Sequence, residues 1–180
     1  MSSQLVYIGL GANLAARALT MGRAVKQLSA IPGMSLEALS SIYESEPEGG
    51  VNQPPYLNAV AEYRTTMSAV ELLDLLMRIE IGLGRDRTAA VPASPRTIDL
   101  DMLLYGEMVL TAPGLVIPHP RMVRRGFVLA PLAEIAPTRA IPGHLLGVHS
   151  SLLELGPRAL PALAGTQEAT GWPGPFRKET

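Results

Sequence analysis

Residues 56–84, YLNAVAEYRTTMSAVELLDLLMRIEIGLG, decide the fold because their hydrophobic pattern changes its period partway along. Residues 56–65 alternate between inward and outward positions in the way that is typical of a strand. Ser68 and Glu71 then have the spacing of a capping box, which predicts the start of a helix. Apolar residues recur at helical spacing beyond Glu71 until Gly84 ends the pattern. A strand followed directly by a helix is therefore predicted.

The flanking sequence supplies further elements in both directions. Residues 5–10 form a continuous apolar run that predicts a buried strand. Asn13 is then the expected N-cap of a helix that ends at Pro32-Gly33. The other expected elements are strands over residues 34–45 and 97–105, a helix over residues 126–135, and loops over residues 46–55 and 85–95, the latter exposed.

The order β-α-β-β-α-β predicts an α+β fold with a ferredoxin-like core, in which two helices cover one face of the sheet. The 180 residues suit one domain. We expect that domain to occupy residues 1–164. Residues 165–180 are rich in Gly, Pro, Thr and charge, which predicts a flexible tail.

Composition narrows the classes of function. Hydrophobic residues make up 47% of the chain and charged residues 17%, so a sizeable core is expected. The net charge of -1 argues against a protein that holds a long nucleic acid by phosphate attraction. Because the chain has no cysteine, a metal would be held by carboxylates or histidines. No apolar run suits a membrane span and no secretory signal is evident, so we expect a cytoplasmic protein and take it to be a monomer.

The sharpest chemical signal is the segment RTIDLD, residues 96–101. Residues two apart on a strand share a face, so Asp99 and Asp101 should point the same way with their Cα atoms about 6.6 Å apart. Such a pair could bridge two magnesium ions that lie about 3.5 to 4 Å apart and also bind substrate phosphates. The alternative is a solvated strand face that carries two acids by chance. The apolar residues around both acids favour the metal site, because buried paired acids need a cation.

Arginines surround this strand in the sequence. The two groups are Arg85, Arg87 and Arg96 around the loop, and Arg121, Arg124 and Arg125 together with His119. These cations could neutralise a polyphosphate that is held against the acids. Ordinary surface arginines are the alternative, and we expect it to apply first to Arg121 and Arg124. His119 alone carries little weight, although the prolines on both sides fix its backbone.

A second group of residues suits a flat heterocycle. Tyr56 and Asn58 are two apart on a strand and share a face, so an aromatic plane lies beside an amide that can donate and accept hydrogen bonds. Phe127 could supply the other side of a stacking site. Core packing is the alternative for all three residues. The Gly9-Leu10-Gly11 segment lacks the third glycine of a dinucleotide loop, so a Rossmann fold is rejected.

Taken in order, several segments resemble the 6-hydroxymethyl-7,8-dihydropterin pyrophosphokinases, folate-pathway enzymes that move a pyrophosphoryl group from ATP to a pterin alcohol. The resemblance spans about residues 7–137 and rests on YIGLGANL, SSIYESEP, QPPYLNAV, IEIGLGRDR, PRTIDLDMLLYG and IPHPRMVRRGFVLAPLAEIAP. It implies an α-β-α sandwich with a ferredoxin-like core and a mainly antiparallel sheet. It also implies attack of the substrate hydroxyl on the β-phosphorus of ATP, with release of AMP.

The resemblance implies roles for individual residues as well. Asp99 and Asp101 would bind Mg²⁺, expected as two ions, and Arg85 and Arg96 would be the main catalytic contacts to phosphate. The pterin pocket maps onto Ser45, Tyr56, Asn58 and Phe127. The ATP site maps onto Glu80, Arg87, His119 and Arg125.

The chain also departs from the family pattern at three places. Residues 91–94 replace a basic residue and an aromatic that many members carry. Met77 stands where a polar residue is frequent, and Glu48 stands where an apolar residue often lines the pterin pocket. An active magnesium-dependent enzyme is the leading hypothesis. A non-catalytic pterin- or nucleotide-binding module is the alternative, and release of AMP would distinguish the two.

Overall fold

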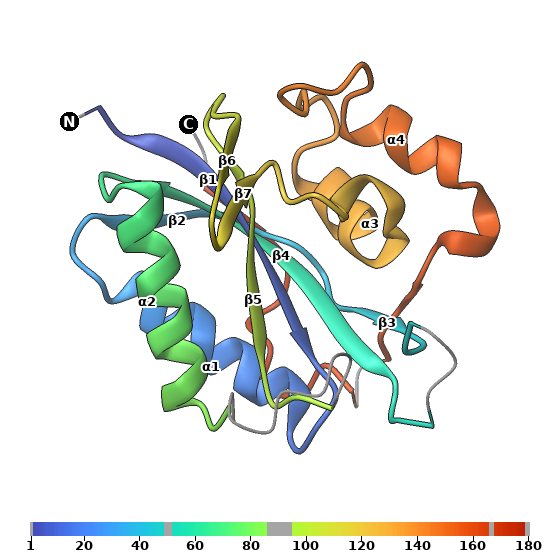
Figure 1. The fold of residues 1–180 in the computed structure, drawn as a ribbon. Coiled ribbons are helices and arrows are strands. Elements are labelled where there is room, and N and C mark those ends of the chain that lie inside the picture. Colours follow the sequence, from blue (N-terminus) through green and yellow to red (C-terminus); the bar gives the residue numbers. More distant parts are fainter. Residues whose placement is uncertain (1, 49–51, 86–94, 166–167, 179–180) are drawn as a thin grey trace.

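The computed structural model of the protein describes residues 2–48, 52–85, 95–165 and 168–178. Its centre is one sheet with helices on both faces (Figure 1). Four strands run side by side in the order β5-β1-β4-β2. They are β1 (Gln4–Ala12), β2 (Met34–Leu39), β4 (Tyr56–Thr65) and β5 (Asp99–Tyr105), and every pairing between them is antiparallel. The predicted mixture of helices with a mainly antiparallel sheet is confirmed, and the ferredoxin-like description of it stays a prediction.

Two helices lie on each side of the sheet. The helices α1 (Arg17–Ser29) and α2 (Ala69–Gly82) lie on one face, and α3 (Gly126–Ile135) and α4 (Val148–Leu155) lie on the other (Figure 1). Each face has its own cluster of buried apolar side chains. The capping box predicted from the sequence begins α2, because the Ser68 side chain accepts from the backbone N–H of Glu71 and the Glu71 side chain accepts from that of Ser68.

The alternation of the strands decides which residues face which pair of helices. On β1, Val6, Ile8 and Leu10 pack in the core under α1 and α2. The residues between them face the other way, where Tyr7 joins the core under α3. Farther along this second face, past the reach of the α3 core, β1 carries only Gly9 and Gly11. That part of the sheet therefore has room above it.

Shorter strands extend the sheet at its edges. The strand β3 (Tyr43–Ser45) pairs with β4, β8 (Ala162–Leu163) pairs with β3, and β9 (Phe176–Arg177) pairs with β2. A separate hairpin consists of β6 (Leu110–Ala112) and β7 (Leu115–Ile117). Two short 3-10 segments, η1 (Met122–Arg124) and η2 (Pro157–Ala159), precede and follow the second pair of helices.

Two local predictions were wrong. The strand expected over residues 34–45 is interrupted after Leu39, because the Ser40 hydroxyl accepts from the backbone N–H of Val60 and Ser41 turns to contact Glu134 on α3. Asn13 does not cap α1. The cap position is Ala16, which has no side-chain cap, while Asn13 contacts the segment ahead of β5 instead.

The C-terminal segment follows the sheet edge. The Trp172 indole Nε1–H donates to the carbonyl oxygen of Ser40 at 3.1 Å, and Ala38 and Leu39 of β2 pair with the strand β9. Composition alone predicted a flexible tail here. The contacts show a segment that packs on the domain, while its flexibility stays a prediction.

No helix in the described part of the chain combines the length and the apolar character that crossing a membrane requires.

Candidate active site

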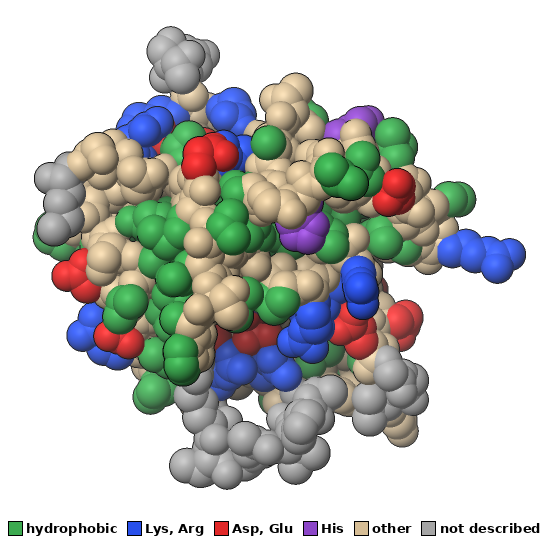
Figure 2. Space-filling view, turned by 45° about the horizontal axis from the view of Figure 1, so that its top comes forward, with side chains coloured by type: hydrophobic (Ala, Val, Ile, Leu, Met, Phe, Trp, Pro, Cys, Tyr) green, Lys and Arg blue, Asp and Glu red, His purple; other side chains and the backbone are tan. Residues whose placement is uncertain are grey.

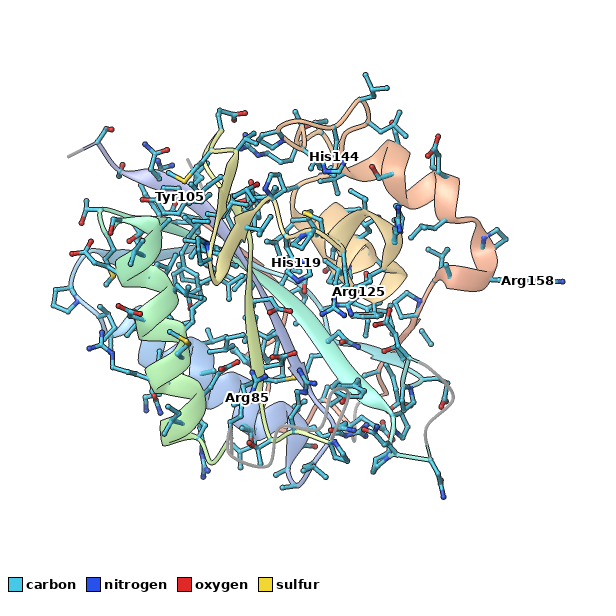
Figure 3. All side chains as sticks on the ribbon, viewed as in Figure 1. Arg85, Tyr105, His119, Arg125, His144 and Arg158 are labelled. Atoms are coloured by element: carbon cyan, nitrogen blue, oxygen red, sulfur yellow. The ribbon has the colours of Figure 1, made fainter. Side chains whose placement is uncertain are left out.

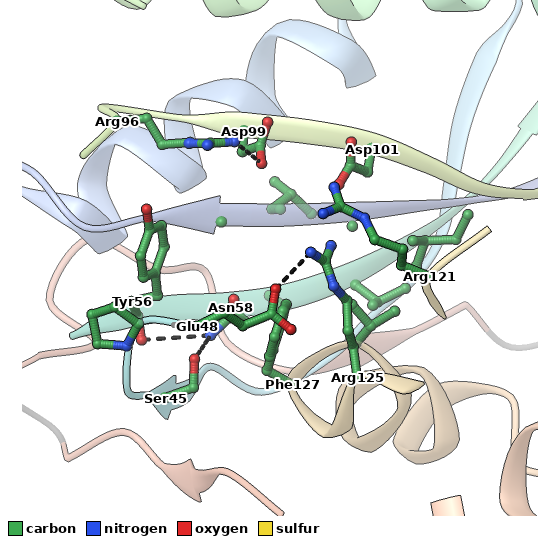
Figure 4. A pocket seen from close by; sticks show the side chains of 18 of the residues that line it. Ser45, Glu48, Tyr56, Asn58, Arg96, Asp99, Asp101, Arg121, Arg125 and Phe127 are labelled. Atoms are coloured by element: carbon green, nitrogen blue, oxygen red, sulfur yellow. Dashed lines mark hydrogen bonds and ion pairs between the residues drawn. The ribbon is translucent and has the colours of Figure 1, made fainter. Parts of the chain in front are cut away.

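The glycine-bearing part of the sheet is the floor of a pocket of about 340 Å³. This volume lies within the range of small-molecule sites in proteins. Strands β5, β1 and β4 form the floor, the chain after β3 forms one wall, and the start of α3 forms another (Figure 4). In the space-filling view, acidic side chains lie in a hollow with basic side chains on either side (Figure 2).

The pairing of the strands places the two predicted groups of residues on one row. Asp99 of β5 lies opposite Gly11 of β1, and Gly11 in turn lies opposite Asn58 of β4. Asp101 lies opposite Gly9 in the next row. Because adjacent strands are about 4.8 Å apart, the acid and the amide are separated by about 10 Å of bare backbone. The prediction that Asp99 and Asp101 share a face is confirmed, since both line this pocket.

Two arginines converge on Asp99 from opposite sides. Its Oδ1 accepts from Nη1 of Arg85 at 2.5 Å, and its Oδ2 accepts from Nη1 of Arg96 at 2.6 Å. Arg85 also forms an ion pair with Glu80 of α2. Glu80 is 1% exposed and accepts a second hydrogen bond from the backbone N–H of Leu100 at 2.7 Å. Arg85, which lies near the end of α2 in Figure 3, thus links Asp99 to Glu80 on that helix.

Asp101 has a different electrostatic setting from Asp99. Burial, followed by the charge of Asp99, raises its pKa to about 6, and Arg125 opposes this shift. His119 lies nearby, with Nε2 at 3.9 Å from Oδ2 of Asp101. Its Nδ1 accepts from the backbone N–H of Arg121 at 3.2 Å, so in the neutral ring the proton is on Nε2, the nitrogen nearer Asp101. Burial, followed by the charges of Arg125 and Arg121, lowers the pKa of His119 to about 4.

The opposite side of the floor carries the aromatic and amide groups. The Asn58 side chain is buried, and its Nδ2 donates to Oγ of Ser45 at 2.9 Å. Tyr56 lines the same side. Burial raises the pKa of the Tyr56 hydroxyl, and the nearby charge of Arg96 lowers it. A hydrogen-bonding edge and an aromatic ring therefore face the pocket together.

The start of α3 supplies the remaining wall. The Arg125 guanidinium lies 5.3 Å from the centre of the Phe127 ring, a distance that allows a cation–π contact. Its Nη2 donates to Oε2 of Glu48 at 2.6 Å. Arg121 also lines the pocket and is exposed, so the expectation that it is an ordinary surface arginine stays a prediction. The 3-10 turn η1 between the two residues brings both side chains to the same wall.

Most of the predicted site residues lie together. Those that line the pocket are Ser45, Tyr56, Asn58, Arg96, Asp99, Asp101, Arg125 and Phe127. Arg85 and His119 lie beside its acids. Glu80, expected at the ATP site, is buried behind Arg85 and forms an ion pair with it. Arg87 lies outside the described residues, as does most of the loop around it.

Sequence reasoning missed Asn13 as a site residue. The Asn13 backbone N–H donates to the carbonyl oxygen of Arg96, and Asn13 Oδ1 accepts from the Arg96 N–H at 2.8 Å. Its Nδ2 donates to Oε1 of Gln53 and to the carbonyl oxygen of Pro54. One buried amide thus holds the backbone of Arg96 and the chain leading into β4. A polar side chain directly after an apolar strand was the available signal.

The donors present fit a hard divalent cation. Asp99 and Asp101 offer carboxylate oxygens on one face, and burial together with the charge of Asp99 raises the pKa of Asp101 in spite of the nearby arginines, so a bound cation would relieve this repulsion. Within the described residues, no group of three or more metal-ligating side chains occurs. A cation held by the two acids would therefore need ligands from water or from phosphate, which is the usual way in which proteins bind Mg²⁺.

Comparison with known proteins identifies relatives. The sequence profile described as 7,8-dihydro-6-hydroxymethylpterin-pyrophosphokinase matches residues 7–137. A 2-amino-4-hydroxy-6-hydroxymethyldihydropteridine pyrophosphokinase of Pseudomonas aeruginosa is 42% identical over 139 residues, which cover 77% of this chain and 85% of that protein. The enzyme of the same name from Bacillus subtilis is 42% identical over 133 residues, which cover 74% and 78%.

Among solved structures, HPPK-DHPS of Plasmodium falciparum superposes with a TM-score of 0.69 at 12% identity, covering 85% of this chain and 43% of that one. That likeness concerns the fold alone. Fold, pocket and sequence relatives together define the class of protein, an α+β pyrophosphokinase. The chain belongs to the 7,8-dihydro-6-hydroxymethylpterin-pyrophosphokinase family, as its motifs predicted.

Proposed function

We propose that this chain transfers a pyrophosphoryl group from ATP to the hydroxymethyl group of 6-hydroxymethyl-7,8-dihydropterin in folate biosynthesis, with Mg²⁺ and with release of AMP. The observation that carries the proposal is the row of Asp99, Gly11 and Asn58. In a chain of this family, this row supports the proposal because an acid that would hold magnesium and an amide that would hold the heterocycle lie about 10 Å apart over one open surface.

The heterocycle would lie on the β4 side of the pocket. Asn58 would present its Oδ1 acceptor to the edge of the pterin, while hydrogen bonds from its Nδ2 to Ser45 and to backbone carbonyl oxygens hold the amide in place. Tyr56 and Phe127 supply aromatic surface on either side of this position. The hydroxymethyl group would then point across Gly11 toward the acids.

The polyphosphate would lie on the β5 side. Asp99 and Asp101 would hold magnesium, which supplies positive charge that offsets the negative charge of the phosphates. Arg85 and Arg96 flank the same carboxylate and would donate to phosphate oxygens. His119 stays neutral near pH 7 and would act as a hydrogen-bond donor through Nε2, and Arg125 reaches the phosphates from the opposite wall.

In the reaction, the substrate oxygen loses its proton to solvent as it bonds to the β-phosphorus. The bond between that phosphorus and the oxygen of the α-phosphate breaks, and AMP leaves with the bonding electrons. The protein contributes chiefly by orienting the two substrates and by stabilising charge in the transition state. No side chain needs to form a bond to phosphorus.

The test is a mixture of ATP, magnesium chloride and the pterin alcohol with purified protein. AMP and a pyrophosphorylated pterin should form in equal amounts, and omission of either substrate should abolish both products. Binding of pterin and ATP without AMP would overturn the proposed reaction and support the alternative of a non-catalytic binding module.

A further inference from the structure

A carboxylate that the proposed reaction does not use lies at the mouth of the pocket. Glu48 follows β3, and its Oε2 accepts from Nη2 of Arg125 at 2.6 Å. The partners are 77 positions apart in the chain, so the contact joins two walls of the pocket. Figure 4 shows the two charged groups facing each other across the space between β4 and α3.

The two partners are unequally held. The Arg125 side chain is 11% exposed, whereas that of Glu48 is 54% exposed. Arg125 packs on the Phe127 ring and occupies the cap position at the start of α3. Within the described residues Glu48 has no other hydrogen bond or ion pair. The arginine is therefore the fixed member of the pair, and the glutamate is the member that can move away.

Arg125 also acts on the acidic side of the pocket. It lines the same pocket as Asp99 and Asp101, and Figure 4 shows its side chain extending from the start of α3 toward the strand that carries them. A polyphosphate bound at the acids would therefore meet Arg125. A carboxylate and a phosphate oxygen both accept hydrogen bonds from the donors of a guanidinium, so they compete for the same positions.

We infer that Glu48 is an internal competitor of the polyphosphate for Arg125 and thereby sets the affinity of the site for magnesium-bound ATP. This inference rests on the proposed function. Binding of the nucleotide requires the ion pair between Arg125 and Glu48 to break. The free energy of that ion pair therefore reduces the free energy of nucleotide binding. A neutral side chain at position 48 leaves Arg125 positioned by Phe127, without a carboxylate on its donor groups.

The test measures the dissociation constant of a nonhydrolysable ATP analogue, α,β-methylene-ATP, in magnesium chloride by calorimetry. Glu48→Gln should lower this constant about three- to tenfold, the range expected for a partly exposed charged hydrogen bond. The matched control is Glu46→Gln. Glu46 is exposed on the same segment and has no ion pair among the described residues, so its substitution should change the constant less than about twofold.

A second comparison isolates Arg125. In an Arg125→Gln background, Glu48→Gln should no longer tighten binding of the analogue. An unchanged or raised dissociation constant for Glu48→Gln alone would overturn the inference, and so would an equal effect of Glu46→Gln or an effect that persists without Arg125. Formation of AMP by the unaltered protein is measured separately. Tighter binding by Glu48→Gln with no AMP from the unaltered protein would sustain the competition and reject the proposed reaction.

Discussion

At Asp101, burial and the neighbouring charges act on the pKa in opposite directions. Burial and the charge of Asp99 raise its pKa to about 6, while nearby arginines act in the other direction. Its side chain is still 41% exposed, so solvent weakens the effect. Because the folded-state pKa is raised, the proton contributes stability that is fully present below about pH 4 and is lost as the pH rises through about 6.

Asp101→Asn should therefore stabilise the magnesium-free protein at pH 7.5. We expect a gain of about 1 kcal/mol, or about 2 to 4 °C in Tm, that shrinks as the pH falls from 7 to 4. Turnover should fall about a hundredfold or more, because one of the two proposed metal ligands is lost. Thermal unfolding at several pH values and the AMP assay measure the two effects. Near-normal turnover of the variant would reject the metal assignment.

Asn58 tests the pterin side of the pocket. Asn58→Ala should weaken pterin binding by about 1 to 3 kcal/mol, because the polar edge of a buried heterocycle is left unpaired. Affinity for magnesium-bound ATP should change less than about twofold, since Asn58 lies two strands away from the acids. Calorimetry with each ligand separately makes the comparison. Equal weakening of both would indicate that β4 itself had been disturbed.

At the scale of whole elements, Glu80 connects the end of α2 to the acid-bearing strand. Glu80→Ala should destabilise the protein by about 2 to 4 kcal/mol, because the Leu100 N–H and Arg85 both lose a buried partner. Glu80→Gln keeps an acceptor for Leu100 and should cost less. Denaturant unfolding gives both values. Equal loss in the two variants would mean that the charge, and not the acceptor, holds α2 to β5.

The elements that sequence reasoning placed well are those with their own local signals. The period-two pattern of β4 and the Ser68 capping box need no distant partner to be recognised. The break after β2 and the role of Asn13 were missed because their partners lie far along the chain. Ser41 contacts a glutamate 93 positions away, and Asn13 contacts Arg96 at a separation of 83.

The same division applies to the candidate site. A shared strand face could be predicted for Asp99 with Asp101, because two residues on one strand fix it. The inclusion of Arg121 in the pocket could not, since it depends on how η1 and α3 return over the sheet. The buried position of Glu80 likewise depends on the packing of α2 against β5.

At the scale of the whole molecule, the C-terminal segment contacts both the chain after β2 and the strand β4. The Trp172 indole donates a hydrogen bond to the carbonyl oxygen of Ser40. Nη2 of Arg177 lies 3.8 Å from Oε2 of the buried Glu62 on β4. Composition gave no sign of this, because a two-residue strand such as β9 has no period of its own and depends on β2 for its pairing.

Deletion of residues 168–180 should lower the Tm by about 5 to 10 °C, because it removes the pairing on β2 and leaves Glu62 without Arg177. Trp172→Phe keeps an aromatic ring and should cause a smaller loss. Turnover measured well below the Tm should be unchanged, since residues 168–178, the described part of the deleted segment, do not line the pocket. A normal Tm after the deletion would show that these contacts contribute nothing to the stability of the fold.

Gly11 has no side chain, so a substitution there can fill part of the pocket without disturbing the packing of the core. A methyl group there would lie 3.7 Å from the Asn58 amide oxygen and 3.9 Å from Cβ of Asp99, which are ordinary contacts. Gly11→Ala should therefore leave the Tm within about 2 °C of the parent value. Turnover should fall sharply, because the added methyl group occupies space between the hydroxymethyl group and the β-phosphorus and prevents their approach. Thermal unfolding and the AMP assay on one preparation of the variant measure the two effects. Such a variant would be a folded protein in which the added methyl group blocks the substrates. Full activity in it would mean that the substrates do not lie against the backbone of β1 between Asp99 and Asn58.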